Sequence, residues 1–355
     1  MGQIAPLTSL RFFAALWVLL FHLRIHLGSP QPFVFERLLL AGPLAMTFFF
    51  VLSGFILVVA SQDKEPWADF AGYAWRRFAR IYPIYLTYLL LFWAVIGFSG
   101  NLGDRPLIAA VALGFTDLTL TNAWFPQVFL GGFGRDGSWS LSAEFFFYAL
   151  FPLLLLHARQ MSDRGIIIAL RWSVGFAALA PVLGKCLPIR SGITDTAYYS
   201  LPIFRLPEFA AGVFYAVWIL RDPARLPSGK KVLCYLVGCA GFICMVPRGL
   251  PYAGYDILLI PALLVLMAYF LRSEKSWAAR LLSTRPLVFF GEISFGLYLM
   301  QILTISLYKM PGHGDGWMGG LVGCLAMTLA LAAAVHLLVE KPMRIWLLSK
   351  KGETR

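Results

Sequence analysis

The sequence has few charged residues, and this scarcity excludes most kinds of soluble protein. Asp, Glu, Lys and Arg make up 14% of its 355 residues, whereas a soluble globular domain carries about 25%. So few charges cannot cover a surface that faces water, and they stand between long apolar runs. Because a transmembrane helix needs roughly 20 mainly apolar residues, the composition predicts an integral membrane protein.

The sequence also lacks a polar stretch long enough to fold as a separate soluble domain. We therefore expect one membrane-embedded domain, residues 1–345, followed by a short basic cytoplasmic tail, residues 346–355. Cysteine is scarce too: the five present lack the spacing of a zinc site or of an extracellular disulfide framework. We expect no bound metal.

Acidic residues are outnumbered, with 18 Asp and Glu against 30 Lys and Arg, which gives a net charge of +12. Such a balance can indicate nucleic-acid binding. Here the basic residues stand in short loops between apolar runs, where the positive-inside rule places them in membrane proteins. The charge therefore predicts a lipid bilayer as the partner and no nucleic acid.

The apolar runs are continuous rather than alternating, which favours transmembrane helices over a barrel. The predicted fold class is therefore all-α, a polytopic membrane protein. Eleven candidate runs occur at residues 7–27, 39–60, 81–99, 107–121, 139–157, 166–183, 200–220, 231–247, 255–271, 286–308 and 317–339.

The basic loops test how many of these runs cross the membrane. If all eleven crossed, three basic clusters and the C-terminal tail would lie on the side opposite to Arg76, Arg77 and Arg80, against the positive-inside rule. One miscounted run before residue 139 removes every conflict, and the run at 107–121 is the shortest and most polar. We therefore predict ten transmembrane helices with both termini cytoplasmic, and a non-spanning or re-entrant segment near 107–133.

Two ionisable residues lie within the first apolar run. Arg11 and His22 are eleven residues apart, which on a helix is about 16 Å and close to three full turns, so they share one face. Taken singly, Arg11 could extend its side chain to the membrane interface, and His22 could hydrogen-bond to a neighbouring residue. Their common face favours a shared polar channel, because ionisable groups inside a membrane are costly and commonly functional.

A carboxylate in a later run completes a possible acid–base pair. The helix beginning at Trp139 descends from the outer side, so we expect Glu144 in the outer half of the membrane, at the depth of His22. A carboxylate beside an imidazole fixes its tautomer and raises its basicity, as general-base chemistry on a hydroxyl requires. A structural ion pair is the alternative. Arg205 and Glu208, three residues apart, are either a plain intrahelical pair or part of the same site.

A basic cluster precedes the third run. Arg76, Arg77 and Arg80 either set the topology or bind phosphate groups, which guanidinium groups hold in bidentate fashion. Ser53 and Gly54 place small side chains in the middle of a phenylalanine-rich helix, which permits close helix contact or leaves room for a slender ligand. Together these features fit a cytoplasmic acyl-CoA whose arm reaches toward His22.

Seven motifs in order give the chain, over almost its whole length, a resemblance to the acyltransferase 3 family of integral membrane O-acyltransferases. These motifs are Arg11 with His22, and the segments 49–55, 77–83, 139–144, 205–212, 291–299 and 339–344. The resemblance implies His22 as the essential histidine, Arg11 as its partner and Glu144 as a functional carboxylate. It also implies an acyl-CoA donor, usually acetyl-CoA, and a hydroxyl acceptor on a carbohydrate, lipid-linked glycan or natural product.

We assign the remaining candidate site residues on the same basis, and we place the enzyme in the inner (cytoplasmic) membrane of the cell. The positions expected to hold the donor are Arg76, Arg77, Arg80 and Ser53. The positions expected to contact the acceptor are Trp139, Ser142, Arg205, Glu208, Tyr298 and Gln301.

The chain departs from the family pattern at two positions. Many relatives have a histidine where this chain has Gln301, and glutamine cannot carry a proton at neutral pH. Many also have an acidic residue where this chain has Phe145. Both departures affect the identity of the acceptor more than the reaction class. A membrane carrier for a small anion or a lipid-linked sugar is the alternative function, although the sequence shows no internal repeat of the kind found in many transporters.

Overall fold

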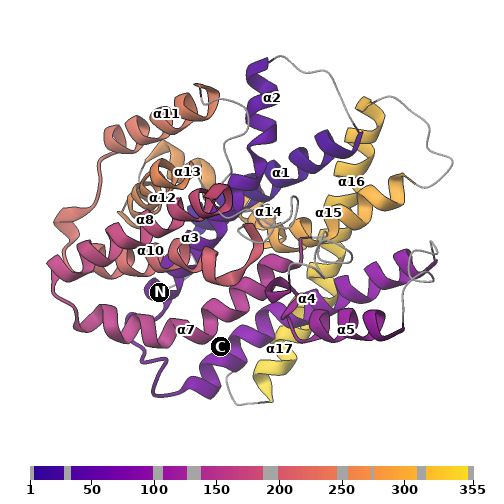
Figure 1. Cartoon of the computed structure of the whole chain (residues 1–355), viewed down its shortest axis with the longest axis horizontal. Coiled ribbons are helices and arrows are strands. Elements are labelled where there is room, and N and C mark those ends of the chain that lie inside the picture. The colour runs from indigo at the N-terminus through magenta and orange to yellow at the C-terminus, as the bar shows by residue number, and fades with distance from the viewer. Residues whose placement is uncertain are drawn as a thin grey trace.

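The computed structural model describes residues 4–27, 33–98, 107–125, 137–186, 199–245, 255–272, 276–309 and 317–350. Within these residues every regular element is a helix (Figure 1), which confirms the predicted all-α class. The longer helices are α1 (Ala5–Leu27), α3 (Ala45–Ala60), α4 (Phe70–Phe98), α7 (Trp139–Gln160), α8 (Asp163–Cys186), α10 (Pro202–Leu220), α11 (Gly229–Met245), α12 (Asp256–Arg272), α15 (Ser294–Tyr308) and α16 (Trp317–Val335).

Shorter elements connect or extend the long helices. They are α2 (Phe33–Leu40), α5 (Leu107–Leu118), α13 (Trp277–Leu282), α14 (Arg285–Glu292) and α17 (Lys341–Ser349), the 3-10 turns η1 (Gly42–Leu44), η2 (Asn122–Trp124) and η4 (Pro223–Arg225), and the π-helical segment η6 (His336–Glu340). Helices occupy each of the ten runs predicted to cross the membrane, with the run at 286–308 divided between α14 and α15. The predicted count of ten spans is not confirmed, because fewer helices of the described chain are long and apolar enough to cross. The predicted run at 39–60 is interrupted near its start, where Pro43 stands in η1.

Length and apolar character identify six single helices of the described chain as able to span a membrane. They are Ala5–Leu27, Gly42–Ala60, Phe70–Val95, Trp139–Gln160, Pro202–Leu220 and Gly319–Ser349. Helices α14 and α15 together would make a seventh span with a bend of 58°. At 12 residues, or about 18 Å, α5 is too short to cross, in agreement with its predicted non-spanning role.

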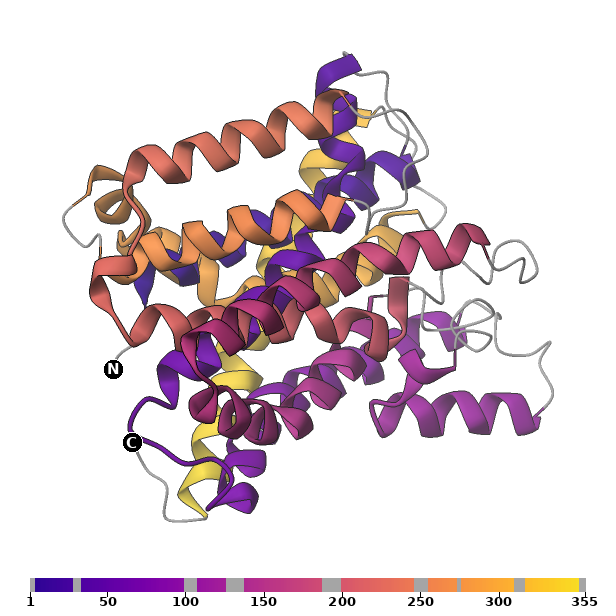
Figure 2. The same ribbon diagram turned by 60° about the vertical axis from the view of Figure 1, so that its left-hand side comes forward.

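Several basic connections meet at one end of the helix bundle. Arg159 at the end of α7 donates to the carbonyl groups of Ser61 and Lys64 in the α3–α4 connection. Asp163 at the start of α8 pairs with Arg221 at 2.9 Å and with Arg225 at 2.6 Å, both from the α10–α11 connection. These connections lie together on the left of Figure 2. The helices between them therefore alternate in direction.

The first and last described helices reach the same end. Ser9 near the start of α1 donates from Oγ to the carbonyl oxygen of Leu282 in α13, at 2.5 Å. Trp75 near the start of α4 donates from its indole nitrogen to the carbonyl oxygen of Leu347 in α17, at 3.0 Å. Helix α17 therefore packs beside the basic start of α4.

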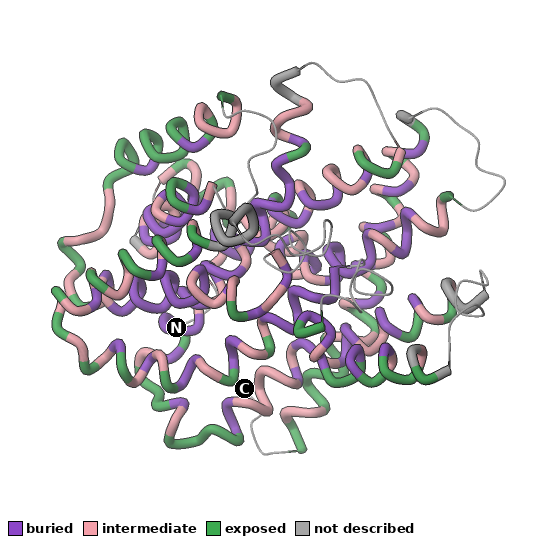
Figure 3. Tube along the Cα trace, viewed as in Figure 1, coloured by how far each residue is buried: buried purple, intermediate pink, exposed green. Residues whose placement is uncertain are grey.

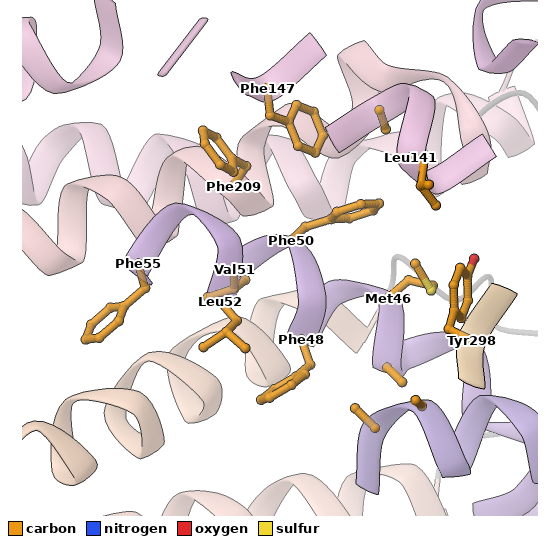
Figure 4. Packing of buried hydrophobic residues seen from close by; sticks show 14 of the residues in the cluster. Met46, Phe48, Phe50, Val51, Leu52, Phe55, Leu141, Phe147, Phe209 and Tyr298 are labelled. Atoms are coloured by element: carbon orange, nitrogen blue, oxygen red, sulfur yellow. The ribbon is translucent and has the colours of Figure 1, made fainter. Parts of the chain in front are cut away.

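Helix α3 lies at the centre of the protein, where buried residues are concentrated (Figure 3). Phe50 of α3 packs against Phe147 of α7 with ring centroids 5.3 Å apart, and Phe147 stacks on Phe209 of α10 at 5.1 Å (Figure 4). A Cβ on Gly54 would lie 2.2 Å from the carbonyl oxygen of Phe209, so only glycine permits this crossing of α3 and α10.

The segment at 107–125 folds back against the other helices. The hydroxyl of Tyr85, in the middle of α4, donates to the carbonyl oxygen of Asp117 at 2.8 Å. Asn122 donates to Ser138 Oγ at 2.7 Å, and both of these residues are buried. The segment thus covers the start of α7, as a re-entrant segment would. The predicted segment extends to residue 133, and its residues 126–133 lie outside the described ones.

Candidate active site

A cavity of about 640 Å³ runs along one side of α3. It contacts α3 from Met46 to Ala60, a length of roughly 21 Å on a helix. Helices α1, α4, α7, α14 and α15 supply other walls, and η6 with α17 supplies a further one. Its ionisable lining residues are Arg11, Arg77, Arg80, Glu144, Glu292, His336, Glu340, Lys341 and Arg344.

Four arginine side chains line this cavity without an ion-pair or hydrogen-bond partner among the described residues. Among the described residues, Arg11, Arg77, Arg80 and Arg344 make no ion pair and no hydrogen bond, although other arginines of the same region do. The Nε atom of Arg77 is buried without a hydrogen-bond acceptor. Five Lys and Arg side chains face three carboxylates here, so the cavity is cationic and suited to an anionic ligand.

Glu144 is held in the middle of the cavity. Its carboxylate accepts hydrogen bonds from Ser53 Oγ at 3.0 Å and from the Tyr148 hydroxyl. The Arg77 guanidinium lies 5.9 Å from the centre of the Tyr148 ring. Arg11 is close enough to Glu144 for their charges to interact. The structure therefore brings Arg11, Arg77, Ser53 and Glu144 to one site, as their assignment to a common channel requires.

His22 lies elsewhere, and the expected pairing of His22 with Glu144 is wrong for the described structure. His22 is absent from the cavity lining and sits about 16 Å farther along α1 than Arg11. The expected depth of Glu144 depended on α7 beginning at the membrane surface. Ser138 and Trp139 are instead buried beneath the 107–125 segment, so Glu144 lies at the level of Arg11.

Gln301 of α15 is a polar neighbour of His22. The two side chains are close enough to interact, but His22 Nδ1 and both amide atoms of Gln301 lack a regular hydrogen-bond partner. Gln301 is fully buried. Unsatisfied polar groups of this kind are costly in a protein interior, so this pair is suited to receive the polar groups of a substrate.

The other predicted donor-site residues divide between the cavity and its surroundings. Arg80 and Ser53 line the cavity, whereas Arg76 does not. Arg76 instead lies 3.6 Å from Asp69 in a partly exposed ion pair. Of the three arginines, Arg77 and Arg80 therefore line the cavity, while Arg76 is engaged outside it.

The predicted acceptor-site residues also separate. Tyr298 lines the cavity, and its hydroxyl donates to the Gly137 carbonyl oxygen at 2.8 Å. Trp139 packs against Tyr199 at 4.8 Å between ring centroids, and Ser142 Oγ accepts from the Ala123 amide at 3.4 Å. Both are buried beside the cavity rather than in its lining.

Arg205 and Glu208 form a separate buried cluster. They pair at 2.9 Å with side chains only 3% and 1% exposed, and Arg205 also contacts Thr47 Oγ1 at 3.4 Å. Thr47 in turn donates to Asp256 at 2.9 Å. This arrangement joins α10, α3 and α12, so the pair is part of a larger buried cluster rather than a plain intrahelical pair.

The sequence prediction missed the wall formed by η6 and α17. His336 Nδ1 lies 2.8 Å from Glu340 Oε2, and Lys341 and Arg344 continue the lining. In the sequence this segment stands out only as a family motif. A π-helical turn is a frequent mark of a functional site, but the sequence does not reveal it. In the described part of the chain, no three His, Cys, Asp or Glu residues gather as metal ligands would.

Comparisons with known proteins identify the family of the chain. The profile of a family described as an acyltransferase domain matches residues 5–337. Acyltransferase MdmB of Streptomyces mycarofaciens is 30% identical over 96% of this chain and 91% of its own. Nodulation protein 10 of Rhizobium leguminosarum bv. viciae is 24% identical over 94% and 91%.

A further relative is the putative peptidoglycan O-acetyltransferase YrhL of Bacillus subtilis, which is 26% identical over 96% of this chain. The match covers 55% of YrhL, so that protein is considerably longer. No solved structure matches the chain. The family profile covers nearly the whole chain, and the chain therefore belongs to the acyltransferase 3 family and is an acyltransferase.

Proposed function

We propose that the protein transfers an acyl group, acetyl being the expected one, from cytoplasmic acyl-CoA to a hydroxyl group of a carbohydrate, lipid-linked glycan or natural product. The observation that carries this proposal is the cavity with its unpaired guanidinium groups. Arginine binds phosphate through charge-assisted hydrogen bonds, and these strengthen where water is excluded. The phosphates of acyl-CoA would supply the missing anionic partners of Arg11, Arg77 and Arg80.

The shape of the cavity supports the same donor. It follows α3 from the end of the molecule with the basic connections toward the buried start of α7. A long, slender molecule can therefore place its phosphates at the basic end and its acyl group near Tyr298. The small side chain of Ser53 leaves space along this path, while the neighbouring Gly54 serves the contact with α10.

In the proposed reaction, His22 is the general base. Its imidazole takes the proton of the acceptor hydroxyl while the hydroxyl oxygen attacks the thioester carbonyl carbon. The new C–O bond forms, the C–S bond breaks, and the proton passes to the sulfur, giving an ester and free CoA. Arg11 supports the donor, and Glu144 is the counter-charge that orients Arg11. Gln301 is the polar partner of His22.

The names of two relatives support the acceptor class. YrhL is named as a putative peptidoglycan O-acetyltransferase, and a Staphylococcus aureus relative, 24% identical, is named as a putative O-acetyltransferase. Acetyl transfer to a carbohydrate hydroxyl is therefore the form of the reaction that we expect to find first.

We also propose that the chain crosses the cytoplasmic membrane ten times with both termini inside. Contacts among the described residues support this topology. Arg159, Arg221 and Arg225 lie at one end with the start of α1 and the helix α17. That end has the basic character that the positive-inside rule assigns to the cytoplasm.

The deciding experiment follows the release of the CoA thiol from acetyl-CoA by the purified protein in lipid nanodiscs. Addition of candidate carbohydrate and natural-product acceptors should accelerate the release and yield an acetylated product detectable by mass spectrometry. Binding of acetyl-CoA without release for any acceptor, together with transport of a small anion or lipid-linked sugar by the same protein in vesicles, would favour the carrier instead.

A further inference from the structure

The two ends of the cavity differ in chemistry. Leu348 and Ile345 of α17, with Ala60 at the end of α3, line the end near the basic connections. Met46 and Tyr298 line the opposite end, which is uncharged. The assignment of a donor to these ends rests on the proposed function, in which the acyl group lies at the Tyr298 end and the adenosine lies beside α17.

Four basic side chains of the cavity stand on two neighbouring helices, α4 and α17. Arg77 and Arg80 are half-buried on α4, whereas Lys341 and Arg344 are exposed on α17. Arg344 is nevertheless close enough to Arg80 and Arg77 for their charges to repel, and the hydrogen bond from Trp75 holds α17 against α4. The four cations therefore belong to one cluster, in which the α17 pair is the more exposed.

The neighbouring acid, Glu340, is shared between a histidine and Arg344. Glu340 lies between η6 and α17, but its Oε2 atom is engaged with His336 Nδ1 at 2.8 Å. Among the described residues, no carboxylate forms an ion pair with Arg344 or Lys341. Positive charge held this close together favours a bound anion, because the anion relieves the mutual repulsion.

CoA carries its phosphates at two distinct places. The diphosphate joins the pantetheine arm to adenosine, and a third phosphate stands on the ribose 3′ oxygen. With the acyl group at the inner end, the ribose phosphate is the outermost anion. We propose that Lys341 and Arg344 bind this 3′-phosphate and that Arg77 and Arg80 bind the diphosphate, so that α17 selects CoA over donors without the ribose phosphate.

The test compares the affinities of CoA and 3′-dephospho-CoA for the full-length protein in nanodiscs. The variants are Lys341→Ala/Arg344→Ala and Arg77→Ala. The matched control is Lys350→Ala, which removes a cation from the end of the same helix; Lys350 lies 4.0 Å over the Trp346 ring and outside the cavity lining. Size-exclusion profiles establish that each variant is folded.

We expect the wild type and Lys350→Ala to bind CoA at least about tenfold more tightly than dephospho-CoA, the effect of a charge-assisted hydrogen bond. In Lys341→Ala/Arg344→Ala this ratio should approach one, with the affinity for dephospho-CoA unchanged. In Arg77→Ala both affinities should decrease by a similar factor, so that the ratio is retained.

Two results would overturn the proposal. A full preference for CoA in Lys341→Ala/Arg344→Ala would remove α17 from phosphate recognition, and loss of the preference in Arg77→Ala alone would place the 3′-phosphate on α4. Either result can be distinguished from a failure of the proposed function, because in that case the wild type would bind neither CoA nor dephospho-CoA.

Discussion

The hydroxyl of Ser53 on α3 donates to the carboxylate of Glu144 on α7 across 3.0 Å. This bond joins two walls of the cavity at the point where the arginines of α1 and α4 converge. A carboxylate at that point subtracts from the positive charge that a phosphate would meet. The Glu144 carboxylate therefore has a role other than binding the donor, and we infer that it orients Arg11.

Glu144→Gln should separate these roles, because glutamine keeps the shape and removes the charge. We expect turnover per folded molecule to decrease at least about tenfold as Arg11 loses its counter-charge. The affinity for CoA should stay the same or increase, since one negative charge fewer faces the phosphates. Turnover and CoA affinity are measured on the same preparation. Weaker CoA binding at normal turnover would contradict the assignment.

Arg77→Ala and Arg80→Ala should each raise the KM for acyl-CoA roughly tenfold or more, because each removes a charge-assisted hydrogen bond to phosphate. Arg76→Ala is the matched control on the same helix, since Arg76 pairs with Asp69 outside the cavity. Steady-state kinetics at varied acetyl-CoA concentration measures the effect. An equal rise in all three variants would reduce the cluster to a general electrostatic contribution.

His22→Ala should reduce turnover by about 10²- to 10⁴-fold, the range that general-base catalysis supplies. Donor binding should be unaffected, because His22 lies outside the phosphate-binding part of the cavity. His26→Ala is the control: its ring lies 6.4 Å from that of His22, one turn farther along the exposed end of α1. Near-normal turnover in His22→Ala would refute the mechanism.

Glu208→Ala should destabilise the protein by about 3–5 kcal/mol, because it breaks the buried ion pair with Arg205. Arg221→Ala, at the end of the same helix, removes an ion pair with the partly exposed Asp163 and should change stability little. Thermal unfolding in detergent compares the two variants. If the cluster is structural, the folded fraction of Glu208→Ala retains its turnover. Equal losses of stability in Glu208→Ala and Arg221→Ala would contradict a structural role for the cluster.

Reporters fused after Arg225 and after Arg280 should both give a cytoplasmic signal. Both positions contact residues at the end of the molecule that we propose to be cytoplasmic. Arg225 pairs with Asp163, and Ser9 of α1 donates to the carbonyl oxygen of Leu282, close to Arg280. A periplasmic signal at both positions would exclude the ten-span topology, and a signal that differs between them would place an odd number of crossings between α10 and α13.

Much of the cavity could be predicted from the sequence because ionisable side chains in apolar runs are rare and conspicuous. Arg11 and Glu144 stand out for that reason, Arg77 and Arg80 stand out as a basic cluster before an apolar run, and all four line the cavity. Their relative depth could not be predicted. Counting residues from Trp139 places Glu144 near the outer surface, but the 107–125 segment covers the start of that helix.

The contribution of α17 could not be foreseen for a different reason. Lys341 and Arg344 follow the last apolar run, where basic residues ordinarily mark the cytoplasmic side. Nothing in their spacing reveals the π-helical turn that precedes them or the Trp75 bond that draws α17 to α4. The same charges therefore have the appearance of a topology signal in the sequence and of a binding surface in the structure.

The crossing of α3 and α10 has a mechanical consequence. Gly54 faces the backbone of Phe209, and Gly212 faces that of Val51, each so closely that an added Cβ would lie 2.2 Å from a carbonyl oxygen. Two helices in such contact cannot slide past one another without separating. The two helices therefore move as one rigid body. Entry and exit of a bulky nucleotide must then depend on displacement of the opposite wall of the cavity, where α17 is anchored to α4.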